Sequence, residues 1–199
     1  MRSGAAFTQH RRLLSRRQQG ALLAEMLVAM LLGSVVMLAA SRLLVTLRAG
    51  HIAHEQRVRL EEEGARALGR IEKDLRRAGF CASGCDMPLP RVDAFPGEAG
   101  ASCVIIYYDL NADGRLDTAG GSGESFGYRL RAGALETQRA VTACGGTQWE
   151  KITDERSVTV TSFRVEGRAG FYVLRLGLRL NGSNQTAALV RLVLAENLQ

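Results

Sequence analysis

The hydrophobic positions of the chain are concentrated in one long run, from Ala21 to Ala40, in which Glu25 is the single charged residue. A helix of about 20 residues is about 30 Å long, which matches the hydrocarbon core of a bilayer. The run therefore predicts a membrane-spanning helix. Glu25 needs an explanation, because a charged carboxylate at the bilayer centre costs about 2.5–3.5 kcal/mol.

Beyond Ala40 the pattern stays helical but becomes amphipathic. Apolar or small residues recur every three or four positions, and charged residues fill the positions between them; the recurring residues are Leu60, Gly64, Leu68, Ile71 and Leu75. This spacing marks one face of a helix. No proline precedes Pro88, so we expect one helix over about residues 21–78 that stops at Gly79.

Short segments with strand-like patterns make up most of the remaining chain. In 174–180, leucines alternate with Arg or Gly, as in a half-buried strand, and Asn181–Asn184 predicts a hairpin turn. The predicted strands are 103–108, 125–131, 134–141, 158–165, 171–180 and 186–194. A long helix followed by an antiparallel meander predicts an α+β fold, with the helix packed on an antiparallel β-sheet.

The net charge of +6 does not indicate nucleic-acid binding once its position is considered. The first 20 residues hold five arginines and no acid, so they account for five of the six net positive charges. A basic segment in front of an apolar run keeps the N-terminus in the cytoplasm. We therefore expect no nucleic-acid partner.

All four cysteines, Cys81, Cys85, Cys103 and Cys144, follow the apolar run. An even number on the exported side of a membrane is typical of two disulfides. Their spacing is a poor match to a structural zinc site. We favour the pairs Cys81–Cys85 and Cys103–Cys144, with the other two pairings still open.

Residues 1–45 allow several kinds of targeting signal. The apolar core is longer than that of a cleaved secretory signal peptide, and Ser15-Arg16-Arg17 would fit a twin-arginine signal only with a less hydrophobic core. The sequence RRQQG-ALLAE resembles the type III signal of type IV prepilins. That resemblance implies cleavage by prepilin peptidase between Gly20 and Ala21, methylation of the new amine at Ala21, and a subunit-docking role for Glu25.

The docking role of Glu25 has a physical basis. In stacked helices the carboxylate of one subunit can pair with the terminal amine of another, which neutralises both charges in an apolar setting. The alternative is an ordinary membrane anchor whose acid lies near the interface. The implied domains are a cleaved leader (1–20), a membrane or filament-core segment (21–45) and a periplasmic globular domain (46–199).

Further blocks of sequence are similar to one family of minor pilins, the prepilin peptidase-dependent protein B family, which is related to PilW-type minor pilins and J-type minor pseudopilins. The matching blocks are Arg77–Cys81 with Cys85, Cys103–Asp117, Phe126–Leu130, Leu135–Cys144 and Trp149–Thr153. The resemblance implies the type IV pilin fold and a structural subunit that helps initiate type IV pilus assembly, in a complex at the filament tip.

The implied location is the bacterial inner membrane, with one membrane pass and a periplasmic C-terminal domain, and later the tip of a pilus or pseudopilus. The implied partners are other minor pilins, the major pilin, prepilin peptidase, the inner-membrane assembly platform and inner-membrane lipid. Two alternatives stay open: a J-like minor pseudopilin of a type II secretion system, or a membrane-tethered binding module for adhesion or DNA uptake.

The segment from Asp109 to Asp117 resembles the first part of an EF-hand calcium loop. Asp109, Asn111, Asp113 and Asp117 occupy liganding positions, but Gly120 stands where a bidentate Glu belongs. Glu124 lies four residues further on and could complete the site only with a different loop geometry. Calcium binding and a plain Asp/Asn/Gly-rich turn are both open interpretations. No other cofactor is indicated. No nucleophile–base set is recognisable either, so we expect no enzymatic activity.

Overall fold

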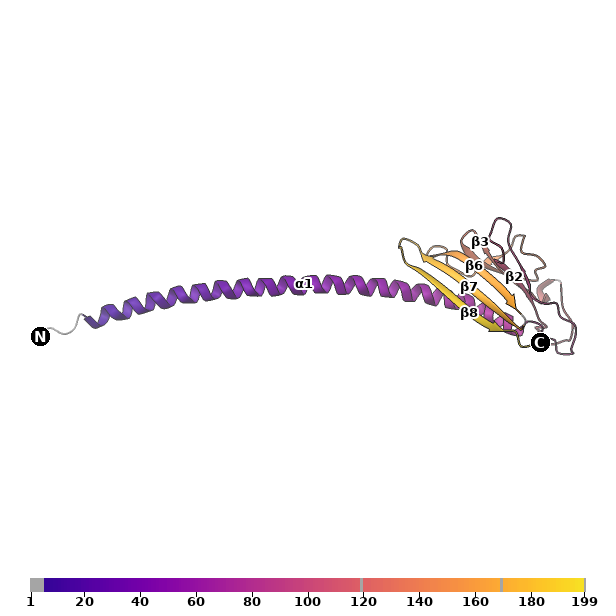
Figure 1. The fold of residues 1–199 in the computed structure, drawn as a ribbon, viewed down its shortest axis with the longest axis horizontal. Helices are drawn as coiled ribbons and strands as arrows, with labels where there is room; N and C mark the ends of the chain where they lie inside the picture. Colours follow the sequence, from indigo (N-terminus) through magenta and orange to yellow (C-terminus); the bar gives the residue numbers. More distant parts are fainter. Residues whose placement is uncertain (1–5, 119, 169, 199) are drawn as a thin grey trace. The chain divides into compact units, whose positions relative to one another are not determined.

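The computed structural model describes residues 6–118, 120–168 and 170–198, with side-chain surroundings from Leu22 onward except at Gly121. One long helix, α1, precedes a series of strands (Figure 1). The elements are α1 (Ala6–Arg77), β1 (Arg91–Asp93), β2 (Cys103–Tyr107), the 3-10 turn η1 (Gly120–Ser122), β3 (Ser125–Arg131), β4 (Ala134–Arg139), β5 (Glu150–Lys151), β6 (Val158–Arg168), β7 (Phe171–Leu180) and β8 (Thr186–Leu194).

The helix α1 covers the predicted range and begins further toward the N-terminus, at Ala6. It ends as predicted, because Gly79 adopts a φ of 81° and donates its backbone N–H to the carbonyl of Tyr107 at 2.9 Å. The chain divides into two compact units between Ile52 and Ala53, so α1 contributes to both.

All six predicted strands are present, but they form two antiparallel sheets instead of one meander. The first sheet has the order β1-β2-β3-β4-β5, and the second has the order β6-β7-β8. The break falls between β5 and β6, where a turn at Asp154–Ser157 replaces strand pairing. The hairpin predicted at Asn181–Asn184 joins β7 to β8.

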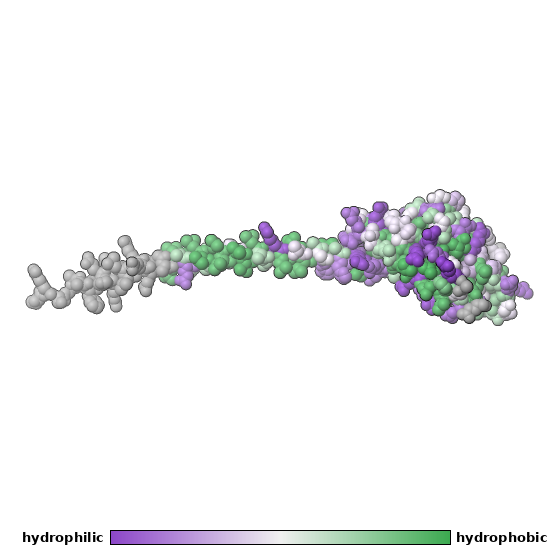
Figure 2. Space-filling model, in the orientation of Figure 1, coloured by the Kyte–Doolittle hydropathy of each residue, from purple (hydrophilic) through white to green (hydrophobic). Residues whose placement is uncertain are grey.

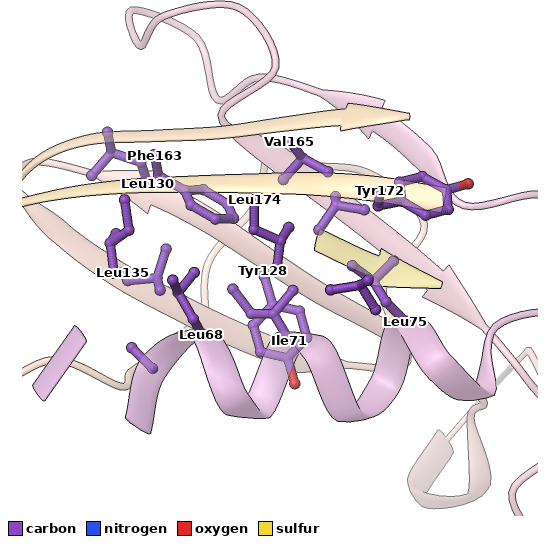
Figure 3. Close-up of a cluster of buried hydrophobic side chains, with 14 of the residues drawn as sticks. Leu68, Ile71, Leu75, Tyr128, Leu130, Leu135, Phe163, Val165, Tyr172 and Leu174 are labelled. Carbon is purple, nitrogen blue, oxygen red and sulfur yellow. The ribbon is translucent and has the colours of Figure 1, made fainter. Parts of the chain in front are cut away.

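The core of residues 53–199 lies between one face of α1 and the inner faces of both sheets. The helix contributes Leu60, Leu68, Ile71 and Leu75, each with no exposed surface. Figure 3 shows part of this cluster, with Tyr128 and Leu130 of β3, Leu135 of β4, Phe163 and Val165 of β6, and Tyr172 and Leu174 of β7 around the helix. Full burial of a leucine side chain contributes about 1.5–3 kcal/mol, so this face fixes the helix to the sheets.

Gly64 allows α1 to approach the second sheet closely. A Cβ at this position would lie 2.7 Å from methyl carbons of both Leu178 in β7 and Leu189 in β8. The predicted small residue on the apolar face is therefore a contact point between the helix and the sheet.

Candidate functional site

The N-terminal half of α1 exposes almost every apolar side chain that the structure describes there. From Leu22 to Leu47, the large hydrophobic residues are 55% (Val35) to 72% (Met37) exposed. Figure 2 shows this stretch as a nearly unbroken run of hydrophobic residues. By length and composition it could cross a membrane. Such a surface is stable only in lipid or against other proteins.

The few hydroxyl groups of this segment are bonded within the helix. The hydroxyl of Ser34 donates to the carbonyl of Leu31, that of Ser41 to Met37, and that of Thr46 to Leu43, at 2.7–2.8 Å. Their donors are therefore satisfied without water, as an apolar environment requires.

Glu25 is the remaining polar side chain near the start of this segment, and it is exposed. The backbone is helical through Gly20 and Ala21, so Ala21 and Glu25 lie one turn apart on the same face. The surroundings of the predicted leader (1–20) and of the Ala21 side chain lie outside the described residues. An amine created at Ala21 would thus lie about one helical turn before Glu25, on the same face of the helix.

A buried carboxylate clamps the C-terminal half of α1 to the first sheet. Asp74 accepts hydrogen bonds from the hydroxyls of Tyr108 (3.0 Å) and Tyr128 (2.6 Å). Burial, together with the charge of Asp74, raises the pKa of Tyr108 to about 12 and raises the pKa of Tyr128 as well. Both tyrosines therefore remain neutral donors to Asp74 near neutral pH.

The two disulfides are Cys81–Cys85 and Cys103–Cys144, the pairs that the sequence analysis favours. They hold different parts of the globular unit. Cys81–Cys85 closes a short loop just after α1, whereas Cys103–Cys144 is buried and joins β2 to the segment after β4.

Arg129, which pairs with Cys103 in the β2–β3 register, fixes the segment that carries Cys144. Its side chain is fully buried, and Nη1 donates to the carbonyl oxygens of Cys144 (2.7 Å) and Gly145 (3.0 Å). Nε donates to Glu136 at 2.8 Å, and the guanidinium lies 4.2 Å from the centre of the Trp149 ring. Nη2 also lies 2.8 Å from the Glu136 carboxylate, as an ion-pair contact without a well-aligned hydrogen bond.

The loop from Asp109 to Glu124 is organised by two buried carboxylates. Asp109 accepts the backbone N–H groups of Ala82, Asp113 and Gly114. Burial opposes its ionisation, but these backbone donors outweigh that effect and lower the pKa of Asp109. Asp109 therefore joins its own loop to the Cys81–Cys85 loop.

Glu124 has the same role at the end of the loop. Its Oε1 accepts the N–H groups of Leu110 (2.6 Å) and Asn111 (3.2 Å), and its Oε2 accepts that of Asp117 (3.1 Å). The sequence had suggested Glu124 only as a distant substitute for the missing calcium ligand.

In this structure the predicted calcium residues form a hydrogen-bonded turn, and calcium binding itself stays a prediction. The oxygens of Asp109 face backbone donors, and the side-chain amide of Asn111 donates to Asp113. Within the described ranges, no group of three or more His, Cys, Asp or Glu side chains is placed to hold a metal ion.

The sequence analysis missed Asp74, Arg129 and Glu136, which hold the globular unit together. One available signal was that Arg129 falls within a strand whose neighbouring positions are apolar. Its partners Glu136 and Cys144 are distant in sequence, so the pattern alone could not name them.

Comparisons with known proteins agree with the predicted resemblance. The family model described as prepilin peptidase-dependent protein B matches residues 53–197. The chain is 29% identical over 178 residues to the prepilin peptidase-dependent protein B of Escherichia coli (strain K12), which covers 87% of this chain and 92% of that relative. No solved structure shows a significant match. The chain therefore belongs to the prepilin peptidase-dependent protein B family.

Proposed function

We propose that the chain is a minor pilin, a non-catalytic subunit that helps initiate type IV pilus assembly within a complex of minor subunits at the filament tip. Prepilin peptidase removes residues 1–20 and methylates the amine of Ala21. Residues 21–45 anchor the subunit in the inner membrane, and residues 46–199 lie in the periplasm. One observation carries the proposal: the N-terminal half of α1 is apolar and exposed on all sides. Glu25 is the single charged residue between Leu22 and Ser41.

Glu25 is the docking contact in this proposal. In the bilayer, a lone carboxylate at this position carries a desolvation cost. In a helical bundle it can pair with the amine of Ala21 on a neighbouring subunit whose helix is displaced by about one turn along the axis. The pairing satisfies both charges, so it favours the assembled state at one axial register.

The partners follow from the same segment. Lipid surrounds it before assembly, prepilin peptidase acts at its start, and the helices of other minor pilins and of the major pilin surround it afterwards. The inner-membrane assembly platform moves the subunit from the first state to the second. The internally bonded hydroxyls of Ser34, Ser41 and Thr46 support both states, because neither offers water.

Mass analysis of the mature N-terminus tests the proposal directly. The full chain is produced in cells with and without prepilin peptidase and isolated from the membrane fraction. We expect a chain that starts at methylated Ala21 in the first case and an intact leader in the second. A chain that keeps Met1 in both strains, or a cut near Ala40, would contradict the proposal.

Deletion of the gene then identifies the filament. Loss of surface pili with normal protein secretion would support the type IV pilus. Loss of secretion with normal pili would move the subunit to a type II secretion pseudopilus.

A further inference from the structure

The strand β8 leaves one edge of the second sheet open. Among the residues that the structure describes, β8 pairs only with β7. It is 9 residues long (Thr186–Leu194), its register with β7 runs without a shift, and Arg191 is its single charged residue. An edge of this kind presents a row of unpaired backbone N–H and C=O groups, which can bind another strand.

The other sheet edges carry the features that prevent such pairing. In the first sheet, the edge strands β1 and β5 are only 3 and 2 residues long. In the second sheet, β6 has an irregularity between Val160 and Ser162 and exposes arginine side chains. Short length, bulges and charges are the usual protections of an edge. β8 has a single charge and no bulge or proline, so its open edge is an exception within this molecule.

The outer face of β8 is apolar as well as open. Val190, Leu192 and Leu194 alternate along the strand and are 57%, 64% and 61% exposed. The register continues this surface onto β7, where Leu192 pairs with Val173 and Leu194 with Phe171. In Figure 2, hydrophobic residues are visible over β7 and β8 beside hydrophilic ones. A patch of this kind beside a free edge is typical of an interaction surface.

The charges around the patch indicate the chemistry of its partner. The same outer face carries Arg164, Arg168, Arg175 and Arg179, all exposed, and a single acid, Glu166. The carboxylate of Glu166 lies 3.7 Å from Arg175 Nε and 4.0 Å from Arg164 Nε, so this one acid lies between two of the arginines. The face keeps an excess of positive charge and matches a surface that carries carboxylates.

A second copy of this chain and a lipid surface both fit less well. A second copy would bring its own arginines against these and Arg191 of one β8 close to that of the other, which like charges oppose. A lipid surface would cover the apolar residues but leave the backbone groups of the β8 edge without hydrogen-bond partners. An added strand satisfies those groups and covers the apolar face at once.

We propose that β8 and the outer face beside it bind an extended, acidic segment of a different protein subunit, which adds a strand to the second sheet. Apolar residues of that segment cover Val190, Leu192 and Leu194, and its carboxylates face Arg175 and its neighbours. The proposal rests on the proposed pilin function and specifies which surface of the globular unit recognises a neighbouring subunit.

In-cell photocross-linking of the full chain tests this proposal. A photoreactive phenylalanine is placed at Leu192 in one strain and at Arg115, an exposed loop position, in a control strain. Cross-linked products are digested, and the joined peptides are identified by mass spectrometry. We expect the Leu192 product to contain a strand-forming peptide of another subunit with Asp or Glu beside apolar residues.

Three results would overturn the proposal: joining to a second copy of this chain, joining only to lipid, or no product above that at Arg115. The N-terminal mass is measured in the same cells. Normal cleavage after Gly20 with no specific product would overturn the docking surface alone, whereas a chain that keeps its leader would overturn the pilin function.

Paired substitutions add an independent measure. The double variant Val190→Thr/Leu192→Thr keeps strand-forming residues, and Arg175→Glu reverses one charge. Each should lower the yield of the product formed from a separate photoreactive residue at Leu194 by about tenfold, as for a central contact of an interface. Ala188→Thr, on the same face of β8, is the matched control and should leave the yield unchanged. A Lys in place of an acid in the partner's cross-linked peptide should restore the cross-linking yield of the Arg175→Glu variant. A yield that stays low would contradict the pairing of opposite charges.

Discussion

The two halves of α1 belong to one continuous helix, yet their side chains have opposite surroundings. From Leu22 to Leu47 the apolar residues are exposed, whereas Leu60, Leu68, Ile71 and Leu75 in the second half are fully buried. The first half is apolar on all sides, and the second is apolar on one face only. Backbone geometry therefore does not distinguish the two halves, and the arrangement of side chains decides which surroundings each half requires.

The difference also separates two kinds of stability. Contacts of the second half lie within the chain, so they contribute to the folding of the globular unit. The first half has to obtain its contacts from lipid or from other proteins. Substitutions in the two halves should thus affect different measurements, and the predictions below run from the largest expected effect to the smallest.

The largest effect is expected for Glu25→Ala on assembly. Removing one member of a buried charge pair costs about 3–5 kcal/mol, so docking should weaken on the order of 100-fold or more. We expect very few pili by electron microscopy, with cleavage after Gly20 and chain abundance unchanged. Glu25→Gln should behave like Glu25→Ala, because it keeps the size of the side chain but not its charge.

Glu62→Ala is the control in the second half of α1, because Glu62 is an exposed acid of the same helix. It should leave the number of pili unchanged. A normal pilus number with Glu25→Ala, or an equal loss with Glu62→Ala, would remove the functional distinction between the two halves.

Leu68→Ala should have the largest effect on folding. Truncation of a fully buried leucine costs about 2–5 kcal/mol, whereas Leu31→Ala, in the exposed half, should change the stability of the globular unit by less than about 0.5 kcal/mol. Chemical unfolding of the full chain in detergent can be followed by fluorescence of Trp149, the one tryptophan. Equal losses of unfolding free energy in the two variants would show that both halves of α1 contribute to the stability of the globular unit.

Tyr128→Phe should lower the unfolding free energy by less than Leu68→Ala does, by weakening the contact between the second half of α1 and the first sheet. It removes the 2.6 Å hydrogen bond to Asp74 and leaves part of a buried carboxylate unsatisfied, at a cost of about 1–3 kcal/mol. Tyr107→Phe is the control, because Tyr107 is only partly buried and lies outside this clamp. An unchanged unfolding midpoint in Tyr128→Phe would contradict the role given to Asp74.

The same clamp should make stability depend on alkaline pH. The pKa of Tyr108 is raised from 10.0 to about 12, so the folded state holds this proton more tightly than the unfolded state does. The contribution is complete below pH 10 and is lost as the pH rises from there through about 12. Tyr108→Phe should flatten this part of the profile of unfolding free energy against pH. An equally steep fall of the unfolding free energy above pH 10 in Tyr108→Phe would show that other groups cause the pH dependence.

The smallest effect is expected from calcium. Asp109 and Glu124 already accept backbone N–H groups, so we expect no shift of Tm when millimolar calcium is added to the full chain. Asp109→Asn should lower Tm equally with and without calcium, since it weakens the hydrogen bonds of the loop. A Tm that rises and saturates with calcium would support the EF-hand interpretation, because a ligand that binds only the folded state must stabilise it.

Local patterns were enough to predict the main elements of this fold. The helix stop at Gly79 and the hairpin at Asn181–Asn184 depend on residues next to one another, and both are where the sequence places them. β1 and β5 were missed because strands of 3 and 2 residues are too short to show an alternation. The division into two sheets was also missed, because it depends on pairing between distant segments.

The candidate site shows the same limit. The apolar run and Glu25 can be found in the sequence because their chemistry is local. Asp74 and Tyr128 are 54 residues apart, and no periodicity links them. Asp109 and Glu124 are of residue types that can bind a metal ion, but in this structure their carboxylates accept backbone N–H groups. Residue type alone does not predict those partners.

The clamp at Asp74 also has a mechanical consequence. A pull on the N-terminal half of α1 reaches the sheets along the helix from Leu60 to Leu75, which is about four turns. The buried leucines lie along this length and both tyrosine hydroxyls meet Asp74 near its end, so a force along the helix axis acts on all of these contacts in parallel. The globular unit should therefore resist extraction by shear across the whole contact, and α1 cannot be peeled away one residue at a time.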